Sequence, residues 1–392
     1  MKKLILLFLI LIVVFFSFSI SKTTKIALAD NEVKEELEKE IEENVNSLIG
    51  DDLNQYFSNI EKNFGVNLKD FIKGIINGEI DINAENIIEN LLNSLKNGLK
   101  NSLLSLISII VLTILSSLSK SLTSGFKKEG VDTLIHYSIY GAIICTLTVI
   151  VIDLVKGVSE TLRNVNDLID GVFPIILTLL TALGGVNGGS FLQSFTLLLS
   201  NIVIKLILNL IIPIFYATLV FTFVGNLSET VKLEKFNKSL KSIANWILGI
   251  VFSLVTSFVA VQGLVGASID TISIKTTKFA LSSYVPILGG YLSEGFDIVM
   301  ASCVLIKNAL GLSTFLLLIG VLVAPLIKVL LVSLSLKLIS AFVEPIGESK
   351  VANLLYDTSS CLSLLISSIG GVAFLIFIIL SLVISSFNGG IV

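Results

Sequence analysis

The feature that most constrains the fold is a series of long apolar segments that fills the chain from residue 101 to residue 392. The first two, 101–119 and 133–154, each come close to the roughly 20 apolar residues that a membrane-spanning helix needs. Hydrophobic residues make up 54% of the chain and charged residues only 15%, whereas soluble domains average about 25% charged residues. The sequence therefore excludes a water-soluble globular protein and predicts an all-α, polytopic helical membrane protein, with residues 101–392 as its membrane domain.

Residues 1–29 have the layout of a secretory signal peptide. A positively charged start precedes an apolar run over 4–20, and a small-residue cleavage pattern ends at Ala29. We therefore expect a cleaved signal peptide. Because Lys22 and Lys25 lengthen the region before the cleavage site, an uncleaved N-terminal anchor is the alternative. In both cases the positive end stays inside, and the chain that follows is exported.

Residues 30–100 form a more polar region, in which 16 acidic residues stand against 7 basic ones, a net charge of −9. Apolar residues recur there at helical spacing in four stripes. The first stripe consists of Val33, Leu37, Ile41, Val45 and Leu48. The pattern predicts an exported amphipathic helical region. Helices this short are marginal alone, so their apolar faces should pack as a self-contained cap, on the membrane surface or on a partner protein.

Lysine-rich loops predict how the membrane domain is oriented. Lysines cluster in 120–132 and 226–242, which indicates that both loops face the cytoplasm. Residues 155–170 show no positive excess and are expected to form a loop on the exported side. Further spans are expected over 206–225, 243–266, 298–343 and 360–386. At the length a bilayer requires, the domain holds about six to eight spans.

Two segments, 171–204 and 283–306, are candidate re-entrant segments or broken helices. A proline and a glycine-rich tip interrupt the first, and Pro286, Gly289 and Gly290 interrupt the second. Irregular backbone at membrane depth is tolerated where it lines a cavity or a binding site, so these three residues are candidate functional positions. The two segments share a loose Pro–Gly–Lys order that suggests an internal duplication. The alternative is that hydrophobic sequences align easily.

Ionisable residues inside apolar segments are the other candidate functional positions. A charge at the centre of a spanning helix costs about 2.5–3.5 kcal/mol, so Lys205 and Lys307 require an explanation. If Asp297 lies near the outer interface, Lys307 and the adjacent Asn308 lie about 15 Å deeper. The face around Lys307 suggests a protein-lined cavity, with either a carboxylate partner elsewhere, such as Asp153 or Asp270, or a water-filled path. A lysine that snorkels to an interface is the alternative.

The sequence shows no pattern for catalysis or cofactor binding. It lacks the P-loop, the zinc-hydrolase and the nucleophile-elbow motifs. Cys145, Cys303 and Cys361 are far apart in apolar stretches, which favours neither a disulfide framework nor a metal site. We therefore expect no catalytic residue, no metal and no cofactor. With Arg163 as the single arginine, nucleic-acid binding has almost no support.

From residue 261 onward the sequence becomes specific, and the informative residues are Val261-Gln262-Gly263, Asp270, Thr277-Lys278-Phe279, Val285-Pro286, Gly289-Gly290, Asp297, Ser302, Lys307-Asn308, Gly311, Pro325, Lys328 and Glu344-Pro345. This set is similar to the stage III sporulation protein AE family of endospore-forming bacteria. The likeness extends over essentially the whole chain and is densest between 261 and 328.

The resemblance implies a membrane component of the complex that links the mother cell and the forespore. It places the protein in the mother-cell membrane around the engulfed forespore. The implied partners are other products of its operon, including a secretion-type ATPase and ring-forming proteins, and a forespore membrane protein. The implied role is a channel or export gate, or a transporter that feeds the forespore, and the family offers no catalytic residues. The alternative is a secondary transporter that moves a small solute on its own, which the broken segments and intramembrane lysines favour.

Overall fold

The computed structural model describes residues 106–118, 129–182, 189–227, 233–284, 289–346 and 349–385. These residues are almost entirely helical, which confirms the predicted all-α class. The predicted signal peptide, 1–29, and the predicted exported region, 30–100, lie outside the described residues.

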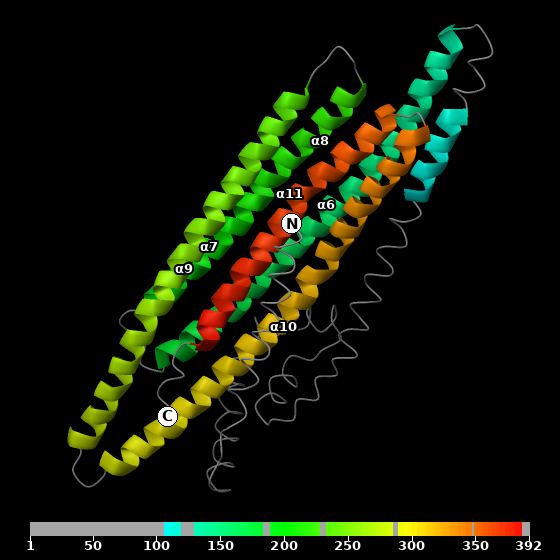
Figure 1. The fold of residues 1–392 in the computed structure, drawn as a ribbon. Helices are drawn as coiled ribbons and strands as arrows, with labels where there is room; N and C mark the ends of the chain where they lie inside the picture. The colour runs from blue at the N-terminus through cyan, green and yellow to red at the C-terminus, as the bar shows by residue number, and fades with distance from the viewer. Residues whose placement is uncertain are drawn as a thin grey trace.

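The described helices form an elongated bundle in which the long elements run roughly along one direction (Figure 1). The elements are α6 (Glu129–Ala182), α7 (Gly189–Leu206), the π-helical turn η1 (Ile207–Ile211), α8 (Ile212–Leu227), α9 (Glu234–Tyr284), α10 (Gly289–Val343), the 3-10 turn η2 (Glu344–Ile346) and α11 (Ser349–Ser385). A shorter apolar helix, Leu106–Leu118, precedes them.

Five helical segments of the described chain are long and apolar enough to cross a membrane. They are Tyr137–Pro174, Leu198–Leu227, Glu234–Gln262, Ile306–Ile346 and Ser349–Leu382. The helices that contain them are often longer than a bilayer is thick. α6 has 54 residues and α10 has 55, so each is about 80 Å long, whereas a bilayer with its headgroups measures about 40–45 Å. These helices therefore extend beyond the membrane.

Helix α11 lies at the centre of the bundle. Of its most apolar window, 67% is buried within the protein, against 40% or less for the other four candidate spans. It contacts α8 and α9 on one side and α6 and α10 on the other (Figure 1). Leu362, Leu365 and Ile369 are fully buried. A mostly apolar helix is buried in protein or in lipid, and α11 is buried mainly in protein.

The long helix α6 corrects the predicted loop over 155–170. Val158, Leu162 and Val165 are fully buried and recur every three or four residues, so they form one continuous helical face. The loop prediction counted the charged residues of this segment and overlooked the apolar residues between them. The helix continues through Pro174 to Ala182.

Residues 189–227 form nearly one continuous helix, and η1 is its only irregularity. Pro213 is the second residue after η1, and the N–H of the intervening Ile212 donates to the carbonyl of Ile207. Proline lacks the N–H that would continue the α-helical pattern, and a π-helical turn absorbs this mismatch. Pro213 therefore coincides with a local change in helical pitch.

The re-entrant predictions over 171–204 and 283–306 stay predictions. In the structure the first segment comprises the end of α6 and most of α7, and the second comprises the end of α9 and the start of α10. The connecting residues 183–188 and 285–288 lie outside the described residues.

Small polar residues hold α10 and α11 together. Ser359 Oγ donates to the carbonyl of Ser333 over 2.7 Å, and the two hydroxyl oxygens lie 2.9 Å apart. Ser340 Oγ donates to the carbonyl of Ala352 over 2.7 Å. Serines permit close helix approach and supply interhelical hydrogen bonds in a membrane. The α10–α11 pair thereby forms a tight hairpin around η2.

Candidate functional site: charged groups within the bundle

Lys307 is enclosed by the bundle. Helix α10 places its side chain at 0% exposure, and its Nζ donates to the carbonyl of Ile384 over 3.4 Å. Ile384 belongs to the last turn of α11, where carbonyl groups have no donor within their own helix. A lysine at this end is also favoured by the helix dipole. The buried lysine thus caps the C-terminal end of the central helix.

The surroundings of Lys307 are shaped by a glycine one turn further along α10. A Cβ added at Gly311 would lie 2.7 Å from Cγ1 of Ile384, so only a glycine lets the end of α11 come this close. Cys303 and Val304, on the same face, are also buried. As expected from the sequence, this face of α10 is therefore buried against other helices of the protein. Its functional role stays a prediction.

Lys328 and Asp153 form an ion pair between α10 and α6. Lys328 Nζ lies 2.7 Å from Asp153 Oδ2, with side-chain exposures of 23% and 61% respectively. Both residues lie within candidate spans. Of the partners suggested for Lys307, Asp153 instead meets Lys328, a different lysine of the same helix.

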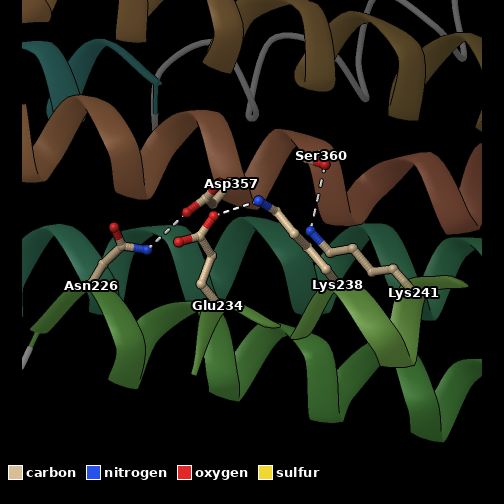
Figure 2. A network of polar contacts seen from close by, with 6 residues as sticks. All are labelled: Asn226, Glu234, Lys238, Lys241, Asp357 and Ser360. Atoms are coloured by element: carbon tan, nitrogen blue, oxygen red, sulfur yellow. Dashed lines mark hydrogen bonds and ion pairs between the residues drawn. The ribbon is translucent and has the colours of Figure 1, made fainter. Parts of the chain in front are cut away.

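A polar cluster joins the ends of three helices (Figure 2). Asn226, near the end of α8, donates through Nδ2 to Asp357 Oδ2 of α11 over 3.1 Å. In the first turns of α9, Lys238 pairs with Glu234, and Lys241 Nζ lies 3.5 Å from Ser360 Oγ. Figure 2 shows the Lys238 side chain beside Asp357. The cluster fixes the α8–α9 connection against α11.

A buried layer of smaller polar groups lies within about one helical turn of this cluster along each of the three helices. Asn237 Nδ2 donates to Thr222 Oγ1 over 2.7 Å, and Thr222 Oγ1 lies 3.3 Å from Cys361 Sγ. All three residues are buried. The layer connects α8, α9 and α11 by side-chain contacts alone.

The remaining predicted site residues are dispersed. Lys205 is exposed on α7, and Asn308 is partly buried beside Lys307. Gly289 and Gly290 are the first two residues of α10. Asp297 belongs to the helical part of α10, but its side chain, like all of Pro286, lies outside the part that the structure describes. No contact among the described residues brings Lys205 to Lys307.

The cluster around Asp357 was missed from the sequence. Its members come from three separate helices, and the spacing within any one helix gives no sign of the others. Lys238 falls in 226–242, which the sequence predicted only as a lysine-rich loop. Within the described residues, no group of three or more His, Cys, Asp or Glu side chains is placed to hold a metal ion.

Comparison with known families matches residues 66–386 to stage III sporulation protein AE. The chain belongs to the stage III sporulation protein AE family. A relative, stage III sporulation protein AE of Bacillus subtilis (strain 168), is 26% identical over 230 residues. That match covers 59% of this chain and 58% of the relative. No solved structure matches.

Proposed function

We propose that this protein is an integral, non-enzymatic component of the channel or secretion-like complex that links the mother cell and the forespore. The observation that carries this proposal is the family match over residues 66–386. Five candidate spans among the described residues support a membrane-embedded role. The proposed partners are a secretion-type ATPase, ring-forming proteins of the same operon and a forespore membrane protein.

We place the protein in the mother-cell membrane around the forespore, with residues 30–100 exported after removal of the signal peptide. The contacts of Asp357 with Asn226 put the α8–α9 connection and the α10–α11 turn at one end of the bundle. If the lysine-rich loop 226–242 faces the cytoplasm, the α10–α11 turn does too. The end of α11 then faces the exported side.

A cross-linked pull-down of the tagged full chain from sporulating cells tests the assembly. We expect the ATPase and the ring-forming proteins to be recovered. The matched variant replaces Leu37, Ile41 and Val45 with Ser, which removes roughly 1.5–3 kcal/mol of burial per side chain if they are buried. It should lose the partners while its membrane level holds. Recovery of no operon product from the unaltered chain would contradict the proposal.

Sidedness and processing are tested separately. In a cysteine-free background, Ser58→Cys should react with an impermeant maleimide from the exported side. Ser124→Cys and Ser349→Cys should react only after the membrane is permeabilised. N-terminal sequencing should give Asp30 as the first residue of the mature chain. Equal reactivity of all three cysteines, or an intact Met1, would contradict this arrangement.

The alternative is a secondary transporter, which the enclosed Lys307 and the Lys328–Asp153 pair favour, because intramembrane ionisable groups mark transport pathways. Purified protein in liposomes distinguishes the two functions. A secondary transporter accumulates its solute against a gradient when it is alone in the membrane, whereas a channel component without its partners does not.

A further inference from the structure

One face of α6 carries a row of charged side chains, which we call the charged seam. It consists of Asp153, Lys156, Glu160, Arg163, Asp167 and Asp170, all of them exposed. Successive members are alternately three and four residues apart, which places them on one face of a helix. Their charges alternate in sign as far as Asp167.

The charged seam points away from the bundle. The opposite face of α6 is buried, with Val158, Leu162 and Val165 at its centre. The two ends of the seam are tied to neighbouring helices. Asp153 accepts from Lys328 of α10 over 2.7 Å, and Asp170 accepts from Asn201 of α7 over 2.7 Å. Between those ends, the described part of the chain shows no ion pair to the seam.

The charged seam lies at the same depth as exposed apolar residues on another side of the bundle. α6 and the α7–α8 helix run antiparallel (Figure 1) and meet at the Asp170–Asn201 hydrogen bond. Glu160 lies ten residues before Asp170, and Leu210 lies nine residues after Asn201. At about 1.5 Å per residue, Glu160 and Leu210 therefore share one level to within about 2 Å.

The depth that Glu160 and Leu210 share lies within a candidate membrane-spanning segment. Leu210 is 42% exposed, and Ile202 and Val220 are exposed on the same candidate span, Leu198–Leu227. Such residues suit a lipid-facing surface. The charged seam, at the same depth, cannot face lipid without a strong penalty.

Direct contact between the charged seams of two copies of the chain is also unfavourable. Two copies in one membrane share one orientation, so a two-fold axis along the seam would set Asp153 against Asp153 and Lys156 against Lys156. Like charges at contact distance repel strongly where the dielectric is low. Water between the seams removes this repulsion.

We propose that the charged seam of α6 lines a water-filled path through the membrane, enclosed by several copies of this chain. This inference rests on the proposed channel function and assigns the surface that would perform it. Each seam residue becomes a ring of charge around the path, and such rings set the selectivity of a pore. Because the rings alternate in sign, the path suits polar solutes and does not select strongly for one sign of ion.

Spin labels at two matched positions of the full-length protein, reconstituted in bilayers, test the environment of the seam. Glu160→Cys and Leu210→Cys are made singly after the exposed Cys145 is replaced by Ser. The label at 160 should collide mainly with a water-soluble nickel chelate, and the label at 210 mainly with oxygen dissolved in lipid. Preferential nickel collision at both positions would place the seam outside the membrane and overturn the proposal. Protection of position 160 from both probes would mean that protein covers the seam, and would overturn it too.

The same Glu160→Cys sample tests the enclosure by copies. Dipolar coupling between labels on different chains is expected, and it should disappear when labelled protein is diluted with unlabelled protein before reconstitution. Absence of coupling at full labelling overturns the multi-copy path. Neither readout depends on partner recovery in the pull-down, so a failure here is distinct from a failure of the proposed complex.

Discussion

Lys328 Nζ on α10 donates to Asp153 Oδ2 on α6 over 2.7 Å, although 175 residues of sequence separate the two side chains. Each residue lies within an apolar candidate span, where a lone charge is strongly disfavoured. The pair therefore explains why both charges are tolerated, and it fixes the register of α6 against α10. Asp153 is also the first residue of the charged seam.

Exchanging the two charges tests this register. Asp153→Lys and Lys328→Asp should each lower the free energy of unfolding by about 1–2 kcal/mol, between the values of exposed and buried pairs. Each single change sets like charges side by side. The double variant should recover most of the loss, as measured by unfolding the purified protein in mixed detergent micelles. If the double variant shows the sum of the two single losses, the residues are not coupled.

Replacement of Lys307 separates structure from function. Lys307→Leu removes a buried charge, which stabilises the protein, and removes the donor to the carbonyl of Ile384, which destabilises it. Because these effects oppose each other, the free energy of unfolding should change by less than about 1.5 kcal/mol. Membrane levels should hold, and sporulation efficiency should fall sharply. Lys235→Leu, at an exposed position of α9, is the control and should sporulate normally. Full sporulation of Lys307→Leu would show that this lysine only caps α11.

The sequence predicted the helical class and located most of the spans, because apolar length and periodicity are local properties. It also placed Lys307 and Gly311 together on a face directed at protein, because four residues make about one turn of a helix. The buried Val158, Leu162 and Val165 could have revealed the extension of α6 through the same periodicity. This extension was missed from the sequence because only the charged residues of the segment were counted.

The partners of the charges could not be predicted in this way. Asp153 meets Lys328 and not Lys307 because the relative sliding of α6 and α10 depends on packing along their whole length. Likewise, Asp357 meets Asn226 across 131 residues. A single sequence records the pitch of each helix and contains no direct measure of the offset between two helices.

Asp357 should stabilise the junction of α8, α9 and α11. Asp357→Ala leaves the amide of Asn226 without its 3.1 Å acceptor, and we expect a loss of about 1–3 kcal/mol. Asp357→Asn retains an acceptor and should recover part of this loss. Glu234→Gln, at the exposed partner of Lys238, is the control and should have no measurable effect. Equal stability of all three variants would show that the cluster is not a structural junction.

Two adjacent glycines in α11 give the sharpest test of helix packing. A Cβ added at Gly371 would lie 2.1 Å from Cε2 and 2.2 Å from Cζ of Phe252, whereas a Cβ added at Gly370 would meet nothing within 4 Å. Phe252 belongs to α9, so its ring sets how closely α9 approaches the central helix. Gly371→Ala should therefore force the two helices apart and lower the free energy of unfolding by about 1–3 kcal/mol.

The control lies one residue away. Gly370→Ala adds the same methyl group to open space and should be neutral or stabilising by up to about 1 kcal/mol, because alanine favours the helix. Combining Gly371→Ala with Phe252→Leu should restore part of the loss, since the smaller side chain vacates the contact. Thermal unfolding of the four proteins in one detergent measures these differences. Equal shifts for the two glycine variants would mean that Phe252 does not rest on Gly371, and that α9 packs against α11 at another register.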